Sequence, residues 1–306
     1  MKVDGFPEGN LPDFFVLGAA RCGTTSLYHY LRRHPALYLS PKIKESGFFA
    51  FRQKGRYYIP LPQKDRFIRD DREYSMLFDK AHSAQSIGEV CTWYLYHNTD
   101  TIGNIQEIYG SRSRNLKLIT IFRNPIERAA SQYGLHVRLG MEPLPFREAI
   151  SAATIEQRMR EGWISGYDYI GYGMYSRQIN KYMDNFPNIK LLWFEDLKKD
   201  AQGFYDNICD FLGVDSIPLD APAYNKSAIP DSPFIFNRIF RPIHLHVLRK
   251  IMPSDVLQRL KNYVLPLVSR QFVLQDEDRD LLKEIYANDI RELSEITGRN
   301  LSRWLV

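Results

Sequence analysis

The segment that most constrains the fold is a glycine loop that follows an apolar run near the amino terminus. The run Phe14–Leu17 leads directly into Gly18–Leu27, in which Gly18 and Gly23 stand five residues apart. Glycines at this spacing between a strand and a helix let backbone N–H groups turn inward onto a phosphate, and the dipole of the following helix favours negative charge. The loop therefore predicts a strand, a phosphate-binding turn and a helix, in that order.

The loop lacks the lysine that follows the second glycine in nucleoside triphosphatases, because Thr24 stands at that position. Arg21 supplies a cation inside the loop instead. The spacing fits phosphate binding, while the missing lysine removes the main charge of an ATP-hydrolysing loop. A P-loop nucleotide kinase or NTPase with an altered loop remains an alternative, and tight ATP or GTP binding with magnesium would distinguish it.

Short β-branched or aromatic runs alternate with longer stretches of helical spacing, which is typical of a parallel sheet flanked by helices. The runs are Phe14–Leu17, Ile87–Val90, Leu116–Phe122 and Ile189–Phe194. We therefore predict an α/β, P-loop-like three-layer fold with a central parallel sheet and a helical carboxyl-terminal portion. We expect one domain over residues 1–306.

Helical spacing follows the first and third of these runs. The first helix is expected to end near His34, and the second to begin with Asn124 as its N-cap and Pro125 at its first position. Further helices are predicted over Tyr172–Asn185, Ala201–Leu212 and Asp276–Thr297.

Composition excludes several classes of protein. The net charge of +5 over 306 residues suits an anionic ligand but falls short of a nucleic-acid binder, so no nucleic acid partner is expected. The cysteines, Cys22, Cys91 and Cys209, are too widely spaced for a disulfide framework or a zinc site. We predict no metal. The sequence shows no secretory leader and no membrane-spanning run, so a cytoplasmic location is expected.

One segment is strongly basic, whereas the remainder of the chain is close to neutral. Residues 234–270 hold seven Lys or Arg against one acid, Asp255, interleaved with apolar residues. The preceding stretch, Gly213–Ser232, is rich in Pro, Asp and Ser and predicts a connecting or ligand-covering loop. Two interpretations of 234–270 stay open: a helical pair with solvated arginines, or an amphipathic surface for peripheral membrane contact or an anionic substrate.

A second anion-binding element follows the strand predicted over Leu116–Phe122. Arg123 stands at the carboxyl end of this strand, the edge at which open α/β sheets bind ligands, and Ser131 follows two helical turns later. Arg123 can hold a phosphate with two parallel hydrogen bonds, and Ser131 can donate one more.

Together these elements resemble the paired 5′-phosphosulfate and 3′-phosphate motifs of sulfotransferases that use 3′-phosphoadenosine 5′-phosphosulfate. The resemblance is to the glycan and heparan-type O-sulfotransferase branch, and it covers roughly Phe14 to Gly213. It is carried by the order and spacing of several pieces: GAARCGTTSL from Gly18, SPKIKESGFF from Ser40, GEVCTWY from Gly88, FRNPIERAASQY from Phe122 and FEDL from Phe194.

The resemblance implies a function and a set of site residues. It implies transfer of a sulfuryl group to a hydroxyl of a carbohydrate or glycolipid, leaving adenosine 3′,5′-bisphosphate. The 3′-phosphate would be held by Arg123 and Ser131. The 5′-phosphosulfate would be held by Arg21, Cys22, Gly23, Thr24, Thr25 and Ser26. The family usually has lysine where this chain has Arg21, and arginine is a poor proton donor, so we expect Arg21 to act through its charge.

In-line transfer also needs a base for the acceptor hydroxyl. Glu45 is the preferred candidate, because it follows the loop cations Lys42 and Lys44 and because similar glycan sulfotransferases place a glutamate base in this stretch. Glu89, next to a strand end, and His136, on the helix after Arg123, remain competing bases.

Three further expectations concern the surroundings of the site. Lys44 is expected to contact the sulfuryl group, and Lys226 to close over the nucleotide. Aromatic rings that could stack on sugars are Phe48, Phe49, Tyr57, Tyr58, Trp93, Tyr94 and Trp163. The remaining alternative is a non-catalytic, membrane-associated nucleotide-binding module that uses residues 234–270.

Overall fold

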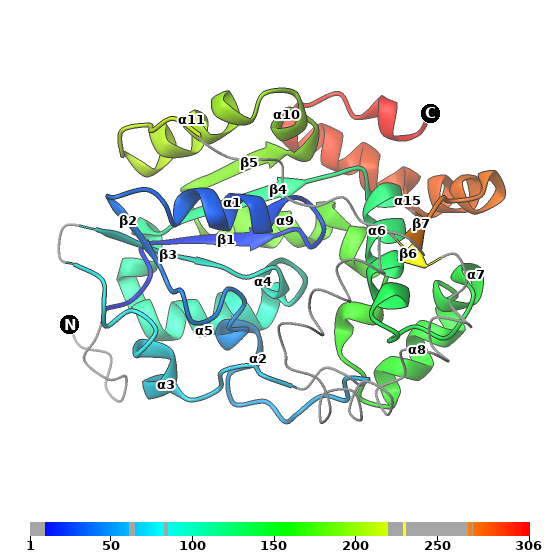
Figure 1. The fold of residues 1–306 in the computed structure, drawn as a ribbon, viewed down its shortest axis with the longest axis horizontal. Helices are drawn as coiled ribbons and strands as arrows, with labels where there is room; N and C mark the ends of the chain where they lie inside the picture. Colours follow the sequence, from blue (N-terminus) through cyan, green and yellow to red (C-terminus); the bar gives the residue numbers. More distant parts are fainter. Residues whose placement is uncertain (1–9, 61–64, 83–84, 220–228, 231–268, 271) are drawn as a thin grey trace.

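The computed structural model describes residues 10–60, 65–82, 85–219, 229–230, 269–270 and 272–306. Within them a five-stranded parallel sheet has the order β2-β3-β1-β4-β5 (Figure 1). Its strands are β1 (Phe14–Gly18), β2 (Leu37–Leu39), β3 (Ser86–Val90), β4 (Lys117–Phe122) and β5 (Ile189–Trp193). A separate antiparallel pair joins β6 (Ile229–Pro230) to β7 (Ser269–Arg270).

Helices cover both faces of the parallel sheet, as predicted. In Figure 1, α1 and α11 lie on one side of the sheet and α2, α3 and α5 on the other. The longer helices are α1 (Thr24–Leu31), α5 (Asn98–Tyr109), α6 (Pro125–Arg138), α8 (Ala152–Arg160), α9 (Tyr175–Asn185), α11 (Ala201–Leu212) and α15 (Asp276–Thr297). The shorter ones are α2 (Phe48–Phe51), α3 (Asp71–Ser75), α4 (Trp93–Tyr96), α7 (Phe146–Ala149) and α10 (Phe194–Lys199).

The predicted helix boundaries agree closely with the structure. Asn124 caps α6 by accepting a hydrogen bond from the backbone N–H of Ile126, and Pro125 begins the helix. The helix predicted from Tyr172 begins instead at Tyr175, because Gly171–Gly173 forms a 3-10 turn. Strand β2 escaped prediction because three residues carry no readable alternation.

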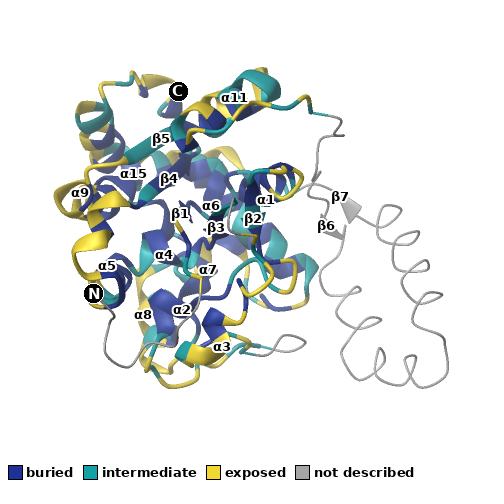
Figure 2. Cartoon of the chain, turned by 90° about the vertical axis from the view of Figure 1, so that its left-hand side faces the viewer, coloured by how far each residue is buried: buried dark blue, intermediate teal, exposed yellow. Residues whose placement is uncertain are grey.

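The sheet is the centre of the core. Every residue of β1 is buried, as expected for a parallel strand covered on both faces, and Figure 2 shows the strands surrounded by buried helix faces. The carboxyl-terminal α15 packs against α9 and α6. Of the segment 234–270, only Ser269–Arg270 lies within the described residues, so its two interpretations stay open.

Strand β3 can lie beside β1 only because residue 88 has no side chain. Gly88 pairs with Phe14, and a Cβ at position 88 would lie 2.0 Å from the Cζ atom of Phe14. Phe14 is fully buried, so its ring has no free space into which to move.

Gly88→Ala should therefore lower the free energy of unfolding by about 3 kcal/mol, the upper range for overpacking a core. Gly103→Ala is the matched control, because Gly103 lies exposed in α5 with nothing within 4 Å of its added Cβ. The control should gain about 0.5–1 kcal/mol from helix propensity. Urea unfolding of both variants checks this, and equal stabilities would contradict it.

Candidate active site

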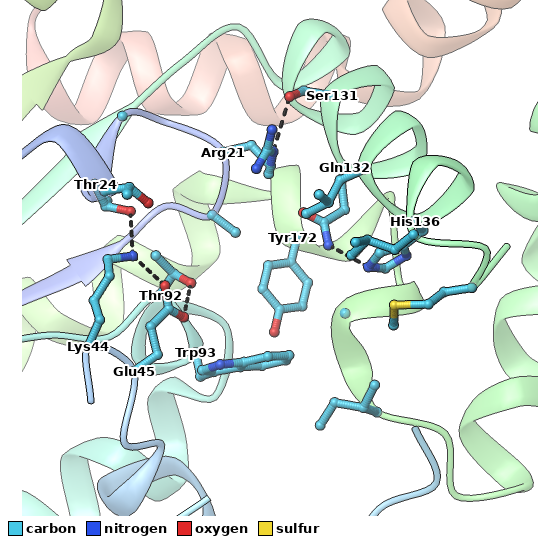
Figure 3. Close-up of a pocket in the computed structure, with 18 of the residues that line it drawn as sticks. Arg21, Thr24, Lys44, Glu45, Thr92, Trp93, Ser131, Gln132, His136 and Tyr172 are labelled. Carbon is cyan, nitrogen blue, oxygen red and sulfur yellow. Dashed lines mark hydrogen bonds and ion pairs between the residues drawn. The ribbon is translucent and has the colours of Figure 1, made fainter. Parts of the chain in front are cut away.

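A cavity of about 500 Å³ lies at the carboxyl ends of β1, β3 and β4 (Figure 3). The β1–α1 loop, Thr92 after β3 and Arg123 after β4 all line it. Parallel strands bring these segments together because their carboxyl ends share one edge of the sheet. The cavity is therefore where the two predicted anion-binding elements meet.

The β1–α1 loop turns through left-handed backbone conformations. Gly23 has a φ of 86° and Arg21 a φ of 69°. A Cβ at position 23 would lie 2.8 Å from Leu197 and 3.0 Å from the Phe194 ring, so both backbone and space require glycine there. No side chain caps the start of α1, which leaves its first N–H groups available to an anion.

Lys44, Glu45 and Thr92 form a connected polar group beside this loop (Figure 3). Lys44 Nζ donates to Glu45 Oε1 at 2.5 Å and to Thr24 Oγ1 at 3.4 Å. Thr92 Oγ1 donates to Glu45 Oε2 at 2.7 Å. The Glu45 side chain keeps 27% of its surface exposed. The lysine that the loop sequence lacks is thus supplied by Lys44, from another segment.

The predicted 5′- and 3′-phosphate ligands are joined by hydrogen bonds. Arg21 Nε donates to Ser131 Oγ at 3.1 Å, and Arg123 Nη1 donates to the backbone oxygen of Arg21 at 3.1 Å. Burial lowers the pKa of Arg21 to about 10, with further lowering by Arg138 and Arg123. Arg21 remains a cation at neutral pH, and a bound anion would relieve the repulsion between these guanidinium groups.

Of the residues predicted to bind the sulfate donor, Cys22 alone does not line the cavity. Its Sγ lies 3.6 Å from the Ala20 oxygen and 3.8 Å from the Tyr175 hydroxyl, and the residue does not line the cavity. Burial raises the pKa of the thiol to about 11. The thiol therefore has a core role, and any contribution to binding is left to the backbone.

Glu89, the second candidate base, lies outside the cavity lining. It is 5% exposed and accepts hydrogen bonds from the hydroxyls of Ser46, Tyr74 and Tyr94. Burial raises its pKa to about 7, although the three hydroxyls act in the opposite direction. Its pKa suits a base, but the residue is buried and does not line the cavity.

His136 does line the cavity, but both of its ring nitrogens are engaged. Nε2 lies 2.9 Å from the Gln132 amide nitrogen, and Nδ1 lies 2.8 Å from the Tyr169 hydroxyl. Burial lowers the pKa of His136 to about 3, with help from Arg21. A ring that binds protons so weakly is a poor general base.

The aromatic residues separate into two groups. Trp93 lines the cavity, whereas Phe48, Phe49 and Tyr94 are buried in the core, and Tyr58 packs against Trp163 away from the lining. Sequence reasoning did not single out several of the lining residues, because nothing in their local pattern marks them. Among them are Arg66, Phe67, Gln132 and Tyr172.

The described part of the chain holds neither a metal-binding cluster nor a membrane-spanning helix. No cluster of three or more His, Cys, Asp or Glu residues that could hold a metal occurs among these residues. No described helix is long and apolar enough to cross a membrane. Lys226 lies outside the described residues, so its predicted role is untested.

A parallel α/β sheet whose first strand enters a glycine loop, with cations and one carboxylate over the strand ends, defines a P-loop-like α/β protein. The chain belongs to the sulfotransferase family: the family's model matches residues 12–218. The predicted family and fold class are thus confirmed.

Similar proteins support this assignment. A sulfotransferase from Alicyclobacillus acidocaldarius has a crystal structure similar over 96% of this chain and 99% of its own, with a TM-score of 0.70 and 28% identity. Human carbohydrate sulfotransferase 15 is 28% identical over 173 residues, which cover 47% of this chain and 30% of that protein. Mouse heparan sulfate glucosamine 3-O-sulfotransferase 3B1 is 21% identical over 301 residues, covering 97% of this chain and 66% of that protein. The chain thus spans less than two thirds of either curated relative.

The buried Glu89 should make stability depend on pH. Its pKa is about 7 in the folded state and 4.5 when unperturbed, so the folded state binds more protons between these values and loses stability as pH rises through this window. Between pH 4.5 and 8 the wild type should lose about 3 kcal/mol relative to Glu89→Gln. Urea unfolding at both pH values measures this, and parallel curves would contradict the burial argument.

Proposed function

We propose that this protein transfers a sulfuryl group from 3′-phosphoadenosine 5′-phosphosulfate to a hydroxyl of a carbohydrate or glycolipid acceptor. One observation carries the proposal: a single cavity joins an uncapped phosphate-binding loop to the Lys44–Glu45–Thr92 group. An anion cradle and a positioned carboxylate in one cavity are what transfer to a hydroxyl requires.

The residues present fit the donor. Backbone N–H groups of residues 23–26 and the Arg21 cation would hold the 5′-phosphosulfate, and Arg123 with Ser131 would hold the 3′-phosphate. The donor supplies the activated sulfuryl group and leaves as adenosine 3′,5′-bisphosphate. The Arg123 guanidinium lies over the Phe194 ring, 5.0 Å from its centroid, and this cation–π contact orients the arginine.

Glu45 is the proposed base. Thr92 and Lys44 each bind one of its carboxylate oxygens, which fixes its direction beside the loop. It would accept the proton of the acceptor hydroxyl as that oxygen bonds to sulfur. Lys44, held between Glu45 and Thr24, would offset the charge that develops on the transferred group, while Arg21 stabilises the departing phosphate.

Location and partners complete the proposal. We propose a cytoplasmic protein that acts on a small-molecule donor without a metal and without nucleic acid. Peripheral membrane contact through residues 234–270 rests on the basic, amphipathic composition of that segment alone.

Glu45→Gln should lower kcat by about 10²–10⁴-fold, the usual contribution of a general base, because an amide cannot accept the proton. The assay follows radiolabelled sulfate from the donor to a panel of glycans, glycolipids and phenols. Glu107→Gln, which changes an exposed carboxylate of α5 that does not line the cavity, should keep its rate. Near-normal turnover by Glu45→Gln would show that another group is the base, and transfer to phenols alone would refute the carbohydrate acceptor.

Arg123→Ala should weaken binding of adenosine 3′,5′-bisphosphate by about 10–100-fold, because a charge-assisted contact to phosphate is lost. Calorimetry without magnesium measures this, with Arg112→Ala, an exposed arginine outside the lining, as control. Tight binding of ATP with magnesium, and none of the bisphosphate, would favour the kinase or NTPase alternative.

A further inference from the structure

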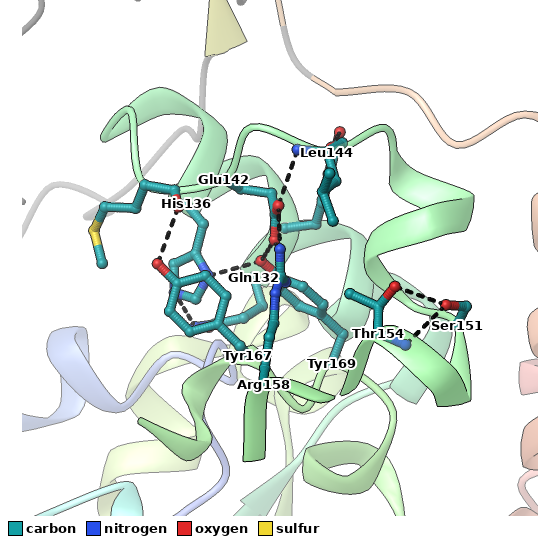
Figure 4. A network of polar contacts seen from close by, with 11 residues as sticks. Gln132, His136, Glu142, Leu144, Ser151, Thr154, Arg158, Tyr167 and Tyr169 are labelled. Atoms are coloured by element: carbon teal, nitrogen blue, oxygen red, sulfur yellow. Dashed lines mark hydrogen bonds and ion pairs between the residues drawn. The ribbon is translucent and has the colours of Figure 1, made fainter. Parts of the chain in front are cut away.

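A buried ion pair behind the cavity wall is the starting point. Arg158 donates to both oxygens of Glu142, each at 2.7 Å, and the two side chains are 6% and 0% exposed (Figure 4). The backbone N–H of Leu144 and the hydroxyl of Tyr169 also donate to Glu142. A carboxylate so placed accepts hydrogen bonds only, and this fixes the direction of the bond from Tyr169.

The direction of this hydrogen bond determines the direction of the next two, which lead to the cavity. Tyr169 gives its one proton to Glu142 Oε2 at 2.8 Å, so its oxygen must accept from His136 Nδ1. Nδ1 of His136 then carries the ring proton, and Nε2 is left as an acceptor. The low pKa of His136 agrees with a neutral ring. Its acceptor nitrogen can face only the NH₂ end of the Gln132 amide, 2.9 Å away.

We propose that this relay, Arg158–Glu142–Tyr169–His136, orients Gln132 so that its carbonyl oxygen faces the cavity and reads a second hydrogen-bond donor on the acceptor. Gln132 lies between Arg21 and His136 in Figure 3, with its nitrogen toward the histidine. Gln132 is then a specificity-determining residue, and the other four are positioning residues.

The surroundings make this contact selective. Leu135, Leu139, Met141 and Ile164 line the same cavity as Gln132. A bound acceptor that offers no hydrogen-bond donor leaves the Gln132 carbonyl oxygen unpaired among apolar side chains. The cost of this unpaired oxygen weakens the binding of such an acceptor. The preferred acceptor therefore carries a hydroxyl or amide N–H besides the hydroxyl that is sulfated, as sugars do and simple alcohols do not.

The first test needs no substrate. In ¹⁵N-histidine spectra of the full chain, His136, assigned by the loss of its signal in His136→Asn, should be neutral at pH 7 with its proton on Nδ1. Tyr169→Phe should abolish this tautomer preference. Tyr167→Phe is the matched control, because Tyr167 is equally buried and donates to the Met141 oxygen outside the relay. A proton on Nε2 would overturn the proposal, because Gln132 would then present its NH₂ group.

The second test rests on the proposed function. Acceptors are octyl β-D-glucopyranoside, octyl β-D-galactopyranoside and the monodeoxy analogues of whichever is sulfated faster. One analogue should lose on the order of tenfold to a hundredfold in kcat/KM with the wild type, mainly through KM, and this penalty should vanish in Gln132→Leu. Gln157→Leu, an exposed glutamine on α8, should keep it.

Failure of the inference about Gln132 and failure of the proposed function give different results. A deoxy penalty that persists in Gln132→Leu overturns the inference while the transferase function stands. Absence of transfer to every acceptor, with the His136 proton on Nδ1, overturns the proposed function and leaves the orientation of Gln132 supported.

Discussion

The site depends on one backbone constraint, the left-handed turn that carries β1 into α1. Gly23 occupies a conformation and a space that no other residue fits, since Leu197 and Phe194 close on its missing Cβ. The turn leaves α1 without a side-chain cap, and residues 23–26 at the start of this helix line the cavity. The fold thus keeps an anion-binding helix start open.

Charge around the cavity follows from this constraint. Among the described lining residues, Arg21, Lys44, Arg66 and Arg123 are cationic and Glu45 is the acid, four against one. Burial and neighbouring guanidinium groups lower the pKa of Arg21, so a bound anion would stabilise the charged form of this group. Lys44, from a different segment, places a lysine beside the loop, because its Nζ donates to Thr24 Oγ1.

The structural features that depend on short stretches of sequence could be predicted. The sheet, the glycine loop and the cap of α6 could be predicted, because apolar runs, glycine spacing and an Asn-Pro pair act within a few residues. The partners of Glu89 and His136 could not, since Ser46, Tyr74 and Tyr169 reach them only through tertiary packing. Both residues competed along the chain with Glu45, the preferred base, and burial distinguishes them from it: Glu89 and His136 are buried, whereas the Glu45 side chain is partly exposed.

A crystal structure with adenosine 3′,5′-bisphosphate bound tests the central claim most directly. The account predicts the 5′-phosphate on the backbone N–H groups of residues 23–26 and the 3′-phosphate on Arg123 and Ser131, with Glu45 facing the open side of the 5′-phosphate. A nucleotide bound in the opposite direction, or outside this cavity, would contradict it.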